Sequence, residues 1–250
     1  MIKKILKWLS IIIAVFLVIA IIVGVIANEK MPEGTPSPEA DATANKMLQA
    51  INYAAWDSTT YVQWTFRGSG EHDYLWDKDR HLVRVIWGAH KVLLNTKTVS
   101  GKAFKGEQEL EGGSADELVQ TAWNYFCNDS FWLNAPAKVF DPGTSRSLVK
   151  LEDGRDGLMI RYESGGVTPG DAYVWILDES GLPVAWKMWV KIIPIGGVEA
   201  SWEDWMTLST GSKISVGHNM AGIKMKLTNV KGAMNWTAMG EERDPFENLN

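Results

Sequence analysis

An apolar run of twenty residues near the amino terminus is the strongest pattern along this chain. It extends from Trp8 to Ala27 and is interrupted only by Ser10 and Gly24. At about 1.5 Å per helical residue, about 20 residues span the roughly 30 Å apolar thickness of a bilayer. The pattern therefore predicts that residues 1–27 form a signal-anchor transmembrane helix, embedded in the cytoplasmic membrane through residues 8–27.

The charges beside this run predict its orientation. Residues 1–27 contain no acidic residue, and all three basic residues precede the run: Lys3, Lys4 and Lys7. By the positive-inside rule these lysines stay in the cytoplasm. We expect a single-pass protein of the bacterial cytoplasmic (inner) membrane, with its C-terminal domain in the periplasm or outside the cell. The alternative is a signal peptide that is cleaved after Ala27.

After the apolar run the pattern changes to a linker and then to a helix. Residues 28–38 are rich in proline, glycine and acidic residues, which predicts a tether. Ser37, Pro38 and Glu39 combine a capping residue, a proline suited to the first helical position and an acid in the first turn. Apolar residues at helical spacing then continue one predicted helix to about Trp56.

From residue 60 the apolar positions alternate with a period of two, which is typical of half-buried strands. The segment YVQWTFRG places three large apolar side chains on one face: Val62, Trp64 and Phe66. The segment HDYLWDKDRHLVRVIW predicts a hairpin with its turn at residues 77–80. Its return strand again has an apolar face, formed by Val83, Val85 and Trp87.

A second helix is predicted from Ser114, because a capping box with Glu117 precedes apolar residues at helical spacing. We interpret the following FWLNAPAKVFDPG as a loop. Further short strands bring the predicted total to about ten. Residues 39–250 are then expected to form one α+β domain, an open and strongly curved antiparallel half-barrel with two helices covering its concave face.

Residues 174–191, VWILDESGLPVAWKMWVK, indicate what this concave face holds. They form a predicted hairpin that turns at residues 178–181, and alternate positions of the return strand are apolar: Val184, Trp186, Met188 and Val190. Two short helices offer limited apolar surface to cover so many rings, which favours a groove for a hydrophobic ligand. The candidate ligand-binding residues are Trp64, Phe66, Trp76, Val85, Trp87, Trp132, Trp175, Trp186, Met188 and Trp202.

The order of elements resembles the periplasmic lipoprotein-carrier family of LolA and LolB. The resemblance covers about residues 40–231 and includes YLW before a charged turn and W-x-L-D-x-x-G-L-P at Trp175 to Pro183. It implies a half-barrel lidded by helices, with acyl chains held in the cavity between them. This chain differs by its membrane anchor, since the only cysteine, Cys127, cannot be a lipidated N-terminus. We therefore expect a membrane-anchored, extracytoplasmic protein that binds a lipid or an acylated protein without catalysis and without a cofactor.

Charge argues against a nucleic-acid partner. The chain has 25 Lys and Arg against 30 Asp and Glu, and three of the lysines precede residue 28. The remainder has 22 basic and 30 acidic residues, a net charge of −8, and cannot neutralise a track of phosphates.

Other functions are weighed against this expectation. Cys127 is predicted to be a small buried hydrophobe rather than a nucleophile. His72, His81 and His90 alternate strand faces, so exposed strand-end histidines are favoured over a zinc site. Glu199 and Glu203 share a predicted strand face and could serve a hydrolase, although an acidic solvent-facing rim is favoured. The main alternative to lipid binding is an anchored protein-interaction or assembly module whose half-barrel is plugged and holds no ligand.

Overall fold

The computed structural model describes residues 2–68, 70–164 and 168–249. The side chains of residues 2–6, 10, 17–23 and 248 also lie outside this description. The first element, α1 (Ile2–Ala27), covers the predicted anchor, and its described apolar side chains are largely exposed, with Phe16 at 68% and Ile26 at 79%. The predicted span of residues 8–27 includes several of the side chains left out. Among the residues described, no helix is long and apolar enough to cross a membrane.

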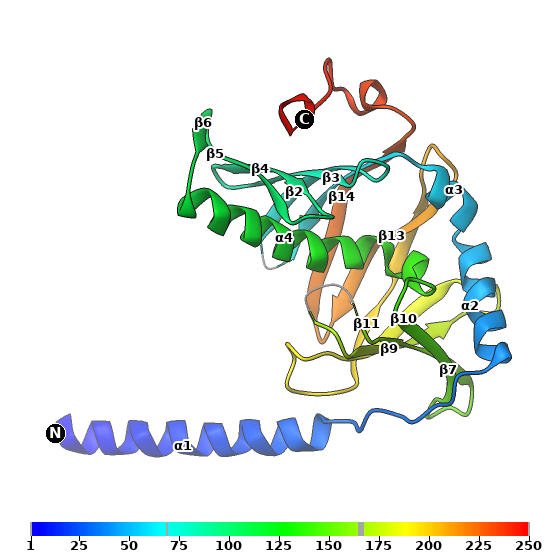
Figure 1. The fold of residues 1–250 in the computed structure, drawn as a ribbon. Coiled ribbons are helices and arrows are strands. Elements are labelled where there is room, and N and C mark those ends of the chain that lie inside the picture. The colour runs from blue at the N-terminus through cyan, green and yellow to red at the C-terminus, as the bar shows by residue number, and fades with distance from the viewer. Residues whose placement is uncertain (1, 69, 165–167, 250) are drawn as a thin grey trace.

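One large, open and strongly curved antiparallel sheet forms the body of the protein (Figure 1). Its strands are β1 (Tyr61–Arg67), β2 (Glu71–Asp77), β3 (Leu82–Trp87), β4 (His90–Asn95), β5 (Ser100–Lys105), β6 (Gln108–Leu110), β7 (Thr144–Lys150), β8 (Asp156–Tyr162), β9 (Asp171–Leu177), β10 (Pro183–Trp189), β11 (Val198–Ser201), β12 (Glu203–Thr207), β13 (Lys213–Met220) and β14 (Ile223–Ala233). They lie in the order β6-β5-β4-β3-β2-β1-β14-β13-β11-β10-β9-β8-β7, with β12 paired to β13. The last strand therefore joins two meanders, because β14 pairs with both β1 and β13.

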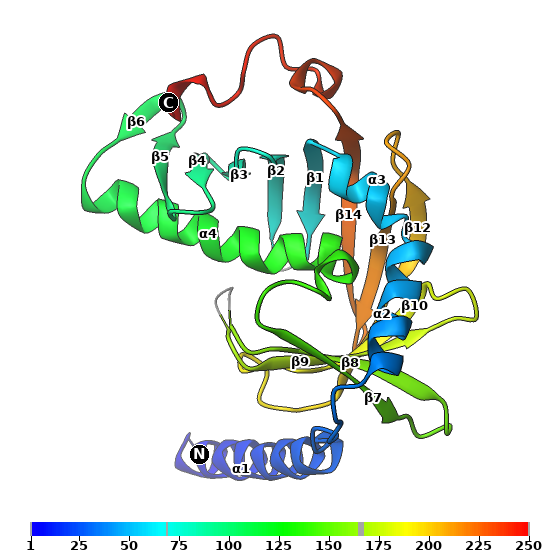
Figure 2. The same cartoon turned by 45° about the vertical axis from the view of Figure 1, so that its right-hand side comes forward.

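The long helix α4 (Gly113–Asn134) lies inside the curve of the sheet, between the half formed by β1–β6 and the half formed by β7–β10 (Figures 1 and 2). Its N-terminus corrects the prediction from sequence. Gly112 caps the helix without a side-chain hydrogen bond, and the hydroxyl of Ser114 donates to the carbonyl of Glu111, so no capping box with Glu117 forms. The helix also extends into the segment predicted as a loop and ends there at Asn134. The 3-10 turn η1 (Ala135–Lys138) follows it.

The predicted helix from residue 38 to about Trp56 is two helices, α2 (Pro38–Ala50) and α3 (Tyr53–Ser58). The predicted cap at Ser37 is present, because the backbone N–H of Ala40 donates to its hydroxyl. The helix is interrupted at Asn52, which adopts a left-handed conformation with φ of 56° and donates a side-chain hydrogen bond to the carbonyl of Gly211. A tertiary contact therefore overrides the helical pattern at this point.

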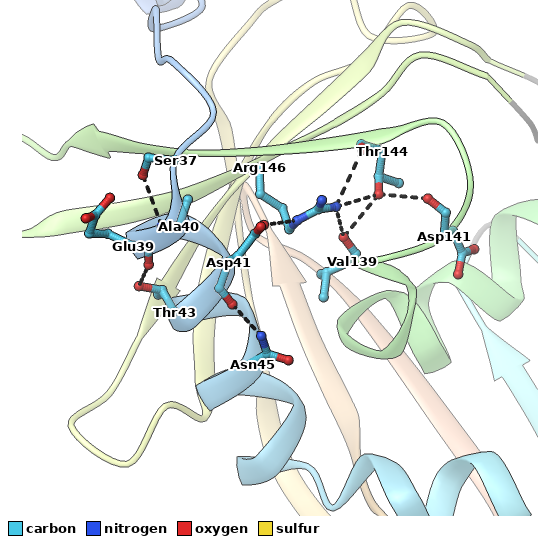
Figure 3. Close-up of polar contacts among 10 residues, drawn as sticks. All are labelled: Ser37, Glu39, Ala40, Asp41, Thr43, Asn45, Val139, Asp141, Thr144 and Arg146. Carbon is cyan, nitrogen blue, oxygen red and sulfur yellow. Dashed lines mark hydrogen bonds and ion pairs between the residues drawn. The ribbon is translucent and has the colours of Figure 1, made fainter.

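The helix α2 is joined to β7 by a partly buried polar contact (Figure 3). The guanidinium of Arg146 donates through Nε to the carboxylate of Asp41 and through Nη1 to the carbonyl of Val139, at 2.9 Å. On the same helix three apolar side chains are fully buried: Ala40, Ala44 and Met47. Both kinds of contact fix α2 beside the strands that follow α4.

The sheet differs from prediction in the number and breaks of its strands. The described residues form fourteen strands where about ten are predicted, because β6 and β7 have no clear alternation and the segment 198–208 divides at Trp202. In β10 the register shifts between Pro183 and Ala185, so Val184 is the extra residue of a bulge. It is 41% exposed, which corrects its prediction as part of the apolar face. Trp186, Met188 and Val190 do enter the core.

A second, smaller core lies on the opposite face of the β1–β4 meander. The C-terminal segment, with the 3-10 turns η2 (Trp236–Met239) and η3 (Glu247–Leu249), covers that face. Its central ring, Phe246, is fully buried among the outward-facing side chains Tyr61, Leu75 and Leu82. The sequence analysis did not predict this layer, because the segment has no helical or strand periodicity.

Candidate ligand site on the concave face

Aromatic rings from the sheet and from α4 meet in two groups on the concave face. In the first, Trp64 on β1 and Trp76 on β2 pack against Phe126 of α4, with ring centroids 6.4 and 5.2 Å from that ring. Tyr74 stacks on Trp64 at 4.4 Å. This group joins the helix to the β1–β6 half of the sheet.

The second group is a triangle of three tryptophans, with Trp175 on β9, Trp186 on β10 and Trp202 between β11 and β12. The ring centroids of Trp175, Trp186 and Trp202 lie 4.8, 5.0 and 5.0 Å apart, and all three side chains are at most 2% exposed. From α4, Phe131 and Trp132 pack on Trp186 at 5.7 and 5.0 Å. The same helix therefore contacts both halves of the curved sheet, the first half through Phe126 and the second half through Phe131 and Trp132 in its following turn.

All ten residues predicted from sequence to line the concave face belong to this one core. Eight of them are buried in it, namely Trp64, Phe66, Val85, Trp132, Trp175, Trp186, Met188 and Trp202. Trp76 and Trp87 are partly buried and pack against it. What fills the concavity here is the ring-bearing face of α4.

Five of these tryptophans share a polar defect. The buried indole nitrogens of Trp64, Trp76, Trp175, Trp186 and Trp202 have no hydrogen-bond partner in the described part of the chain. By contrast, the indole of Trp189 donates to the carbonyl of Glu29 at 2.9 Å, and that of Trp205 donates to the carbonyl of Pro183 at 3.2 Å. Buried indole N–H groups usually find an acceptor. The defect is thus concentrated on the concave face.

A buried polar group crosses the interface between α4 and the sheet. Oδ2 of Asp129 on α4 lies 2.7 Å from Nδ1 of His72 and accepts a hydrogen bond of 2.6 Å from the hydroxyl of Tyr74, both on β2. Asn128 donates to Oδ1 of the same carboxylate at 2.9 Å. Burial and the charge of Asp129 raise the pKa of Tyr74, so its hydroxyl remains a donor.

This group was not predicted from the sequence. The prediction of His72 as an exposed strand-end histidine is wrong, because His72 is 6% exposed and its ring stacks on Tyr125 at 4.0 Å. One signal was present. Asp129 lies three residues after Phe126, on the apolar side of the predicted helix, where a carboxylate requires a buried partner.

His218 on β13 is a second buried histidine beside the tryptophan triangle. Its ring lies 4.6 Å from that of Trp202 and 5.1 Å from that of Trp132, and its Nδ1 is 3.1 Å from the carbonyl of Ser201. Its Nε2 has no partner among the described residues. Burial, opposed by smaller contributions from the carbonyls of Ser201 and Trp132, lowers the pKa of His218 to about 4, so the ring is neutral at pH 7.

A small pocket opens where α3, the end of α4 and β13 meet. It contains about 210 Å³ of empty space, part of it open to solvent, and its lining includes Trp56, Leu133 and Ile214. Pockets for drug-sized ligands usually measure about 300–1,000 Å³. This opening therefore needs to enlarge before it admits an acyl chain.

The alternatives considered from sequence can now be placed. His72 faces Asp129, whereas the ring of His90 packs on Trp87 at 5.5 Å, and no group of three metal-binding side chains occurs in the described ranges. Burial raises the pKa of Cys127 to about 12, which keeps its thiol protonated. Glu199 and Glu203 are both exposed and lie on different strands, β11 and β12.

Comparison with solved structures finds distant matches, including one to a DUF1329 family protein. No protein-family model matches this chain, and no curated protein matches it significantly. A crystal structure of a DUF1329 family protein from Desulfovibrio piger aligns over 81% of this chain and 99% of its own, with a TM-score of 0.40 and 10% sequence identity. At this TM-score the alignment assigns neither a family nor a function.

Proposed function

We propose that this protein is anchored in the bacterial inner membrane and binds the acyl part of a lipid or an acylated protein outside the cytoplasm. The ligand enters the aromatic concavity when α4 moves off the sheet, and no catalysis, cofactor or nucleic acid is involved. The anchor is supported by the sequence of residues 8–27 and by the exposure of the described apolar side chains on α1, such as Trp8 at 66% and Phe16 at 68%.

The observation that carries the proposal is the set of five buried indole N–H groups that have no acceptor among the described residues. A buried donor left unpaired costs about 1–3 kcal/mol. A core required only for stability would gain by replacing such rings with phenylalanine or leucine. A lipid offers what these donors lack, because its acyl chains are apolar and its ester or amide carbonyls accept hydrogen bonds.

For binding to be favourable, the free energy gained by burying the ligand must exceed the free energy of the contacts between α4 and the sheet that the ligand displaces. Burial of about 400 Å² of acyl surface contributes on the order of 10 kcal/mol at roughly 25 cal/mol per Å², before the costs of ordering. Moving α4 removes the contacts of Phe126, Phe131 and Trp132 with the sheet. The helix can repack on the ligand, so part of that loss is recovered.

One observation favours a second function. The rings of α4 already contact those of the sheet, and the pocket nearest them contains only about 210 Å³. A half-barrel plugged in this way would serve as a rigid anchored module that binds or assembles other envelope proteins through its outer surface. In that case the unpaired indoles are a cost of the fold and have no ligand.

A photoreactive lipid distinguishes the two functions. The full chain is produced in membranes containing a lipid with a diazirine near the end of one acyl chain, irradiated, and digested for mass spectrometry. Lipid binding predicts cross-links at Phe131 and Trp175, which face the interior, and their loss on adding excess unlabelled lipid. Cross-links confined to α1 would favour the plugged module.

A matched variant makes the test specific. Trp186→Phe retains an aromatic ring but removes one unpaired donor from the triangle, so we expect fewer cross-links at Trp175. Trp205→Phe removes an indole whose N–H is already bonded to Pro183, and it should leave that labelling unchanged.

A further inference from the structure

The first residues after α1 are fixed to the loop between β10 and β11. The side-chain carbonyl of Asn28 accepts from the backbone N–H of Gly196 at 2.8 Å, and the N–H of Glu29 donates to the carbonyl of Gly196 at 3.0 Å. Nζ of Lys187 on β10 lies 2.8 and 3.0 Å from the two carboxylate oxygens of Glu29. The start of the predicted tether is therefore docked on the body.

The loop sequence is matched to this close approach. A Cβ added to Gly196 would lie 2.7 Å from the carbonyl oxygen of Glu29 and 2.5 Å from the ring of Trp189. A Cβ on Gly197, whose φ is +79°, would lie 2.6 Å from the Cβ of Glu29. Both positions thus need glycine for the chain to lie against the loop.

Apolar side chains are exposed on both of the docked segments. Ile192 in the loop is 70% exposed, while its neighbour Ile193 packs against the main core. At the end of α1, Val25 and Ile26 are 72% and 79% exposed. Cδ1 of Ile195 would lie 4.0 Å from a Cβ at Gly24, which places the loop against the last turn of the helix.

We propose that residues 192–195 are a second membrane contact, seated in the interfacial layer of the bilayer where the chain emerges from it. The proposal rests on the membrane anchor of the proposed function. Val25 and Ile26 end the apolar run of residues 8–27, so a bilayer that covers them lies next to the loop, in which Ile195 is near Gly24 and Gly196 is bonded to Asn28. The contact depends on where Asn28 and Glu29 lie and not on the direction in which α1 runs.

The occupant is lipid rather than a protein partner because residues 192–195 of the loop offer only aliphatic groups, and the preceding Lys191 is a cation suited to lipid headgroups. The sequence from 192 to 195 is Ile-Ile-Pro-Ile, without a charged or hydrogen-bonding side chain that would select a partner. Short apolar segments of this kind enter the boundary between headgroups and acyl chains. The contact would hold the β10–β11 end of the sheet at the membrane and so give the domain one orientation.

A fluorescent label on the loop tests the proposal. The full chain is reconstituted into vesicles of phosphatidylethanolamine and phosphatidylglycerol as Ile192→Cys carrying an environment-sensitive dye, with and without lipids that bear a nitroxide on the acyl chain. We expect a blue-shifted emission that loses most of its intensity with the nitroxide lipid. The unsubstituted chain, whose Cys127 is partly buried, gives the labelling background.

Met234→Cys is the matched control. Met234 is 57% exposed and comes directly after the last residue of β14, at the end of that strand that lies opposite the β13–β14 turn. Its label should show neither effect.

Asn28→Ala with Glu29→Ala should reduce the quenching at residue 192, since the loop is no longer held beside the anchor. An unquenched label on protein that resists alkaline washing would overturn the proposal and leave the anchor intact, whereas release by washing would reject the anchor itself. A blue shift that appears without vesicles and grows with protein concentration would also overturn it, by pointing to a second copy of the chain.

Discussion

Asp129 on α4 and His72 on β2 face each other, with Oδ2 of Asp129 2.7 Å from Nδ1 of His72. Both side chains are almost wholly excluded from solvent. Tyr74 donates to the same carboxylate oxygen. Around them the interface between α4 and the sheet consists mainly of apolar and aromatic contacts, which do not fix one register. The polar contact therefore determines where the helix sits along the concave face.

Replacing the carboxylate should loosen α4 selectively. Asp129→Leu leaves His72 and Tyr74 without their acceptor, at about 1–3 kcal/mol for each. We expect a lower urea midpoint and faster hydrogen exchange in residues 113–134 than in the strands. Tyr74→Phe should cost less, because His72 still bonds to Asp129. As a control, Tyr53→Phe removes a hydroxyl that lies 3.5 Å from the exposed Asp57 and should change stability little. Equal effects of Tyr74→Phe and Tyr53→Phe would contradict this role.

Acid should destabilise the tryptophan triangle through His218. Burial lowers the pKa of His218 from an ordinary 6.5 to about 4, so between these values the unfolded chain binds a proton that the folded chain does not. Stability therefore falls as the pH decreases from about 6.5 to about 4, by on the order of 3 kcal/mol in total. Urea unfolding followed by tryptophan fluorescence at several pH values measures this slope.

His218→Phe keeps a ring against Trp132 and Trp202 but cannot take up a proton. We expect this variant to lose most of the pH dependence in that window. His90→Phe is the comparison, since His90 is only partly buried. A slope that remains unchanged in His218→Phe would assign the acid sensitivity to other groups.

The C-terminal segment should be loosened by removing either of two of its attachments, the Arg80–Asp244 ion pair or the ring of Phe246. Arg80 donates through both terminal nitrogens to Asp244, at 2.6 and 2.8 Å, and Phe246 is fully buried behind this pair. Phe246→Ala is expected to cost about 3–5 kcal/mol, and Arg80→Ala should expose residues 236–249 to proteases without altering the concave core. Phe140→Ala, at a ring that is 41% exposed, should have a small effect on both measurements. Resistance of residues 236–249 to proteolysis in Arg80→Ala would show that the remaining contacts, apolar packing and the Arg84–Glu241 ion pair, hold the segment without Arg80.

Alternation predicted the faces of the strands well, because burial on one side imposes a period of two. Val62, Trp64 and Phe66 share the main core as expected, and the turn at Asp178 forms with its carboxylate accepting from the N–H groups of Ser180 and Leu182. These features depend on residues close together in sequence. An open, curved antiparallel sheet with a helix packed on it follows from them.

Features set by distant residues escaped prediction. The break at Asn52 depends on Gly211, and the burial of His72 depends on Asp129, more than fifty residues away. The outer layer around Phe246 needs partners from β1–β4. The filling of the concavity by α4 was weighed only as the alternative for a local reason: the helix is longer than predicted, so Phe131 and Trp132 project from it rather than from a loop.

The unpaired indoles allow a final prediction in which chemically identical substitutions have different effects. Trp186→Phe removes a buried N–H that has no acceptor, which offsets by about 1–3 kcal/mol the loss of ring volume. Trp189→Phe removes an N–H that donates to the carbonyl of Glu29 and so loses both a hydrogen bond and a contact of the docked linker. We therefore expect Trp189→Phe to destabilise the protein more, although Trp186 is the more deeply buried ring. Urea unfolding of the two variants, prepared without added lipid, measures the difference. Were Trp186→Phe clearly the more damaging, its N–H would have a partner within the fold, and the proposal of a lipid acceptor on the concave face would lose its support.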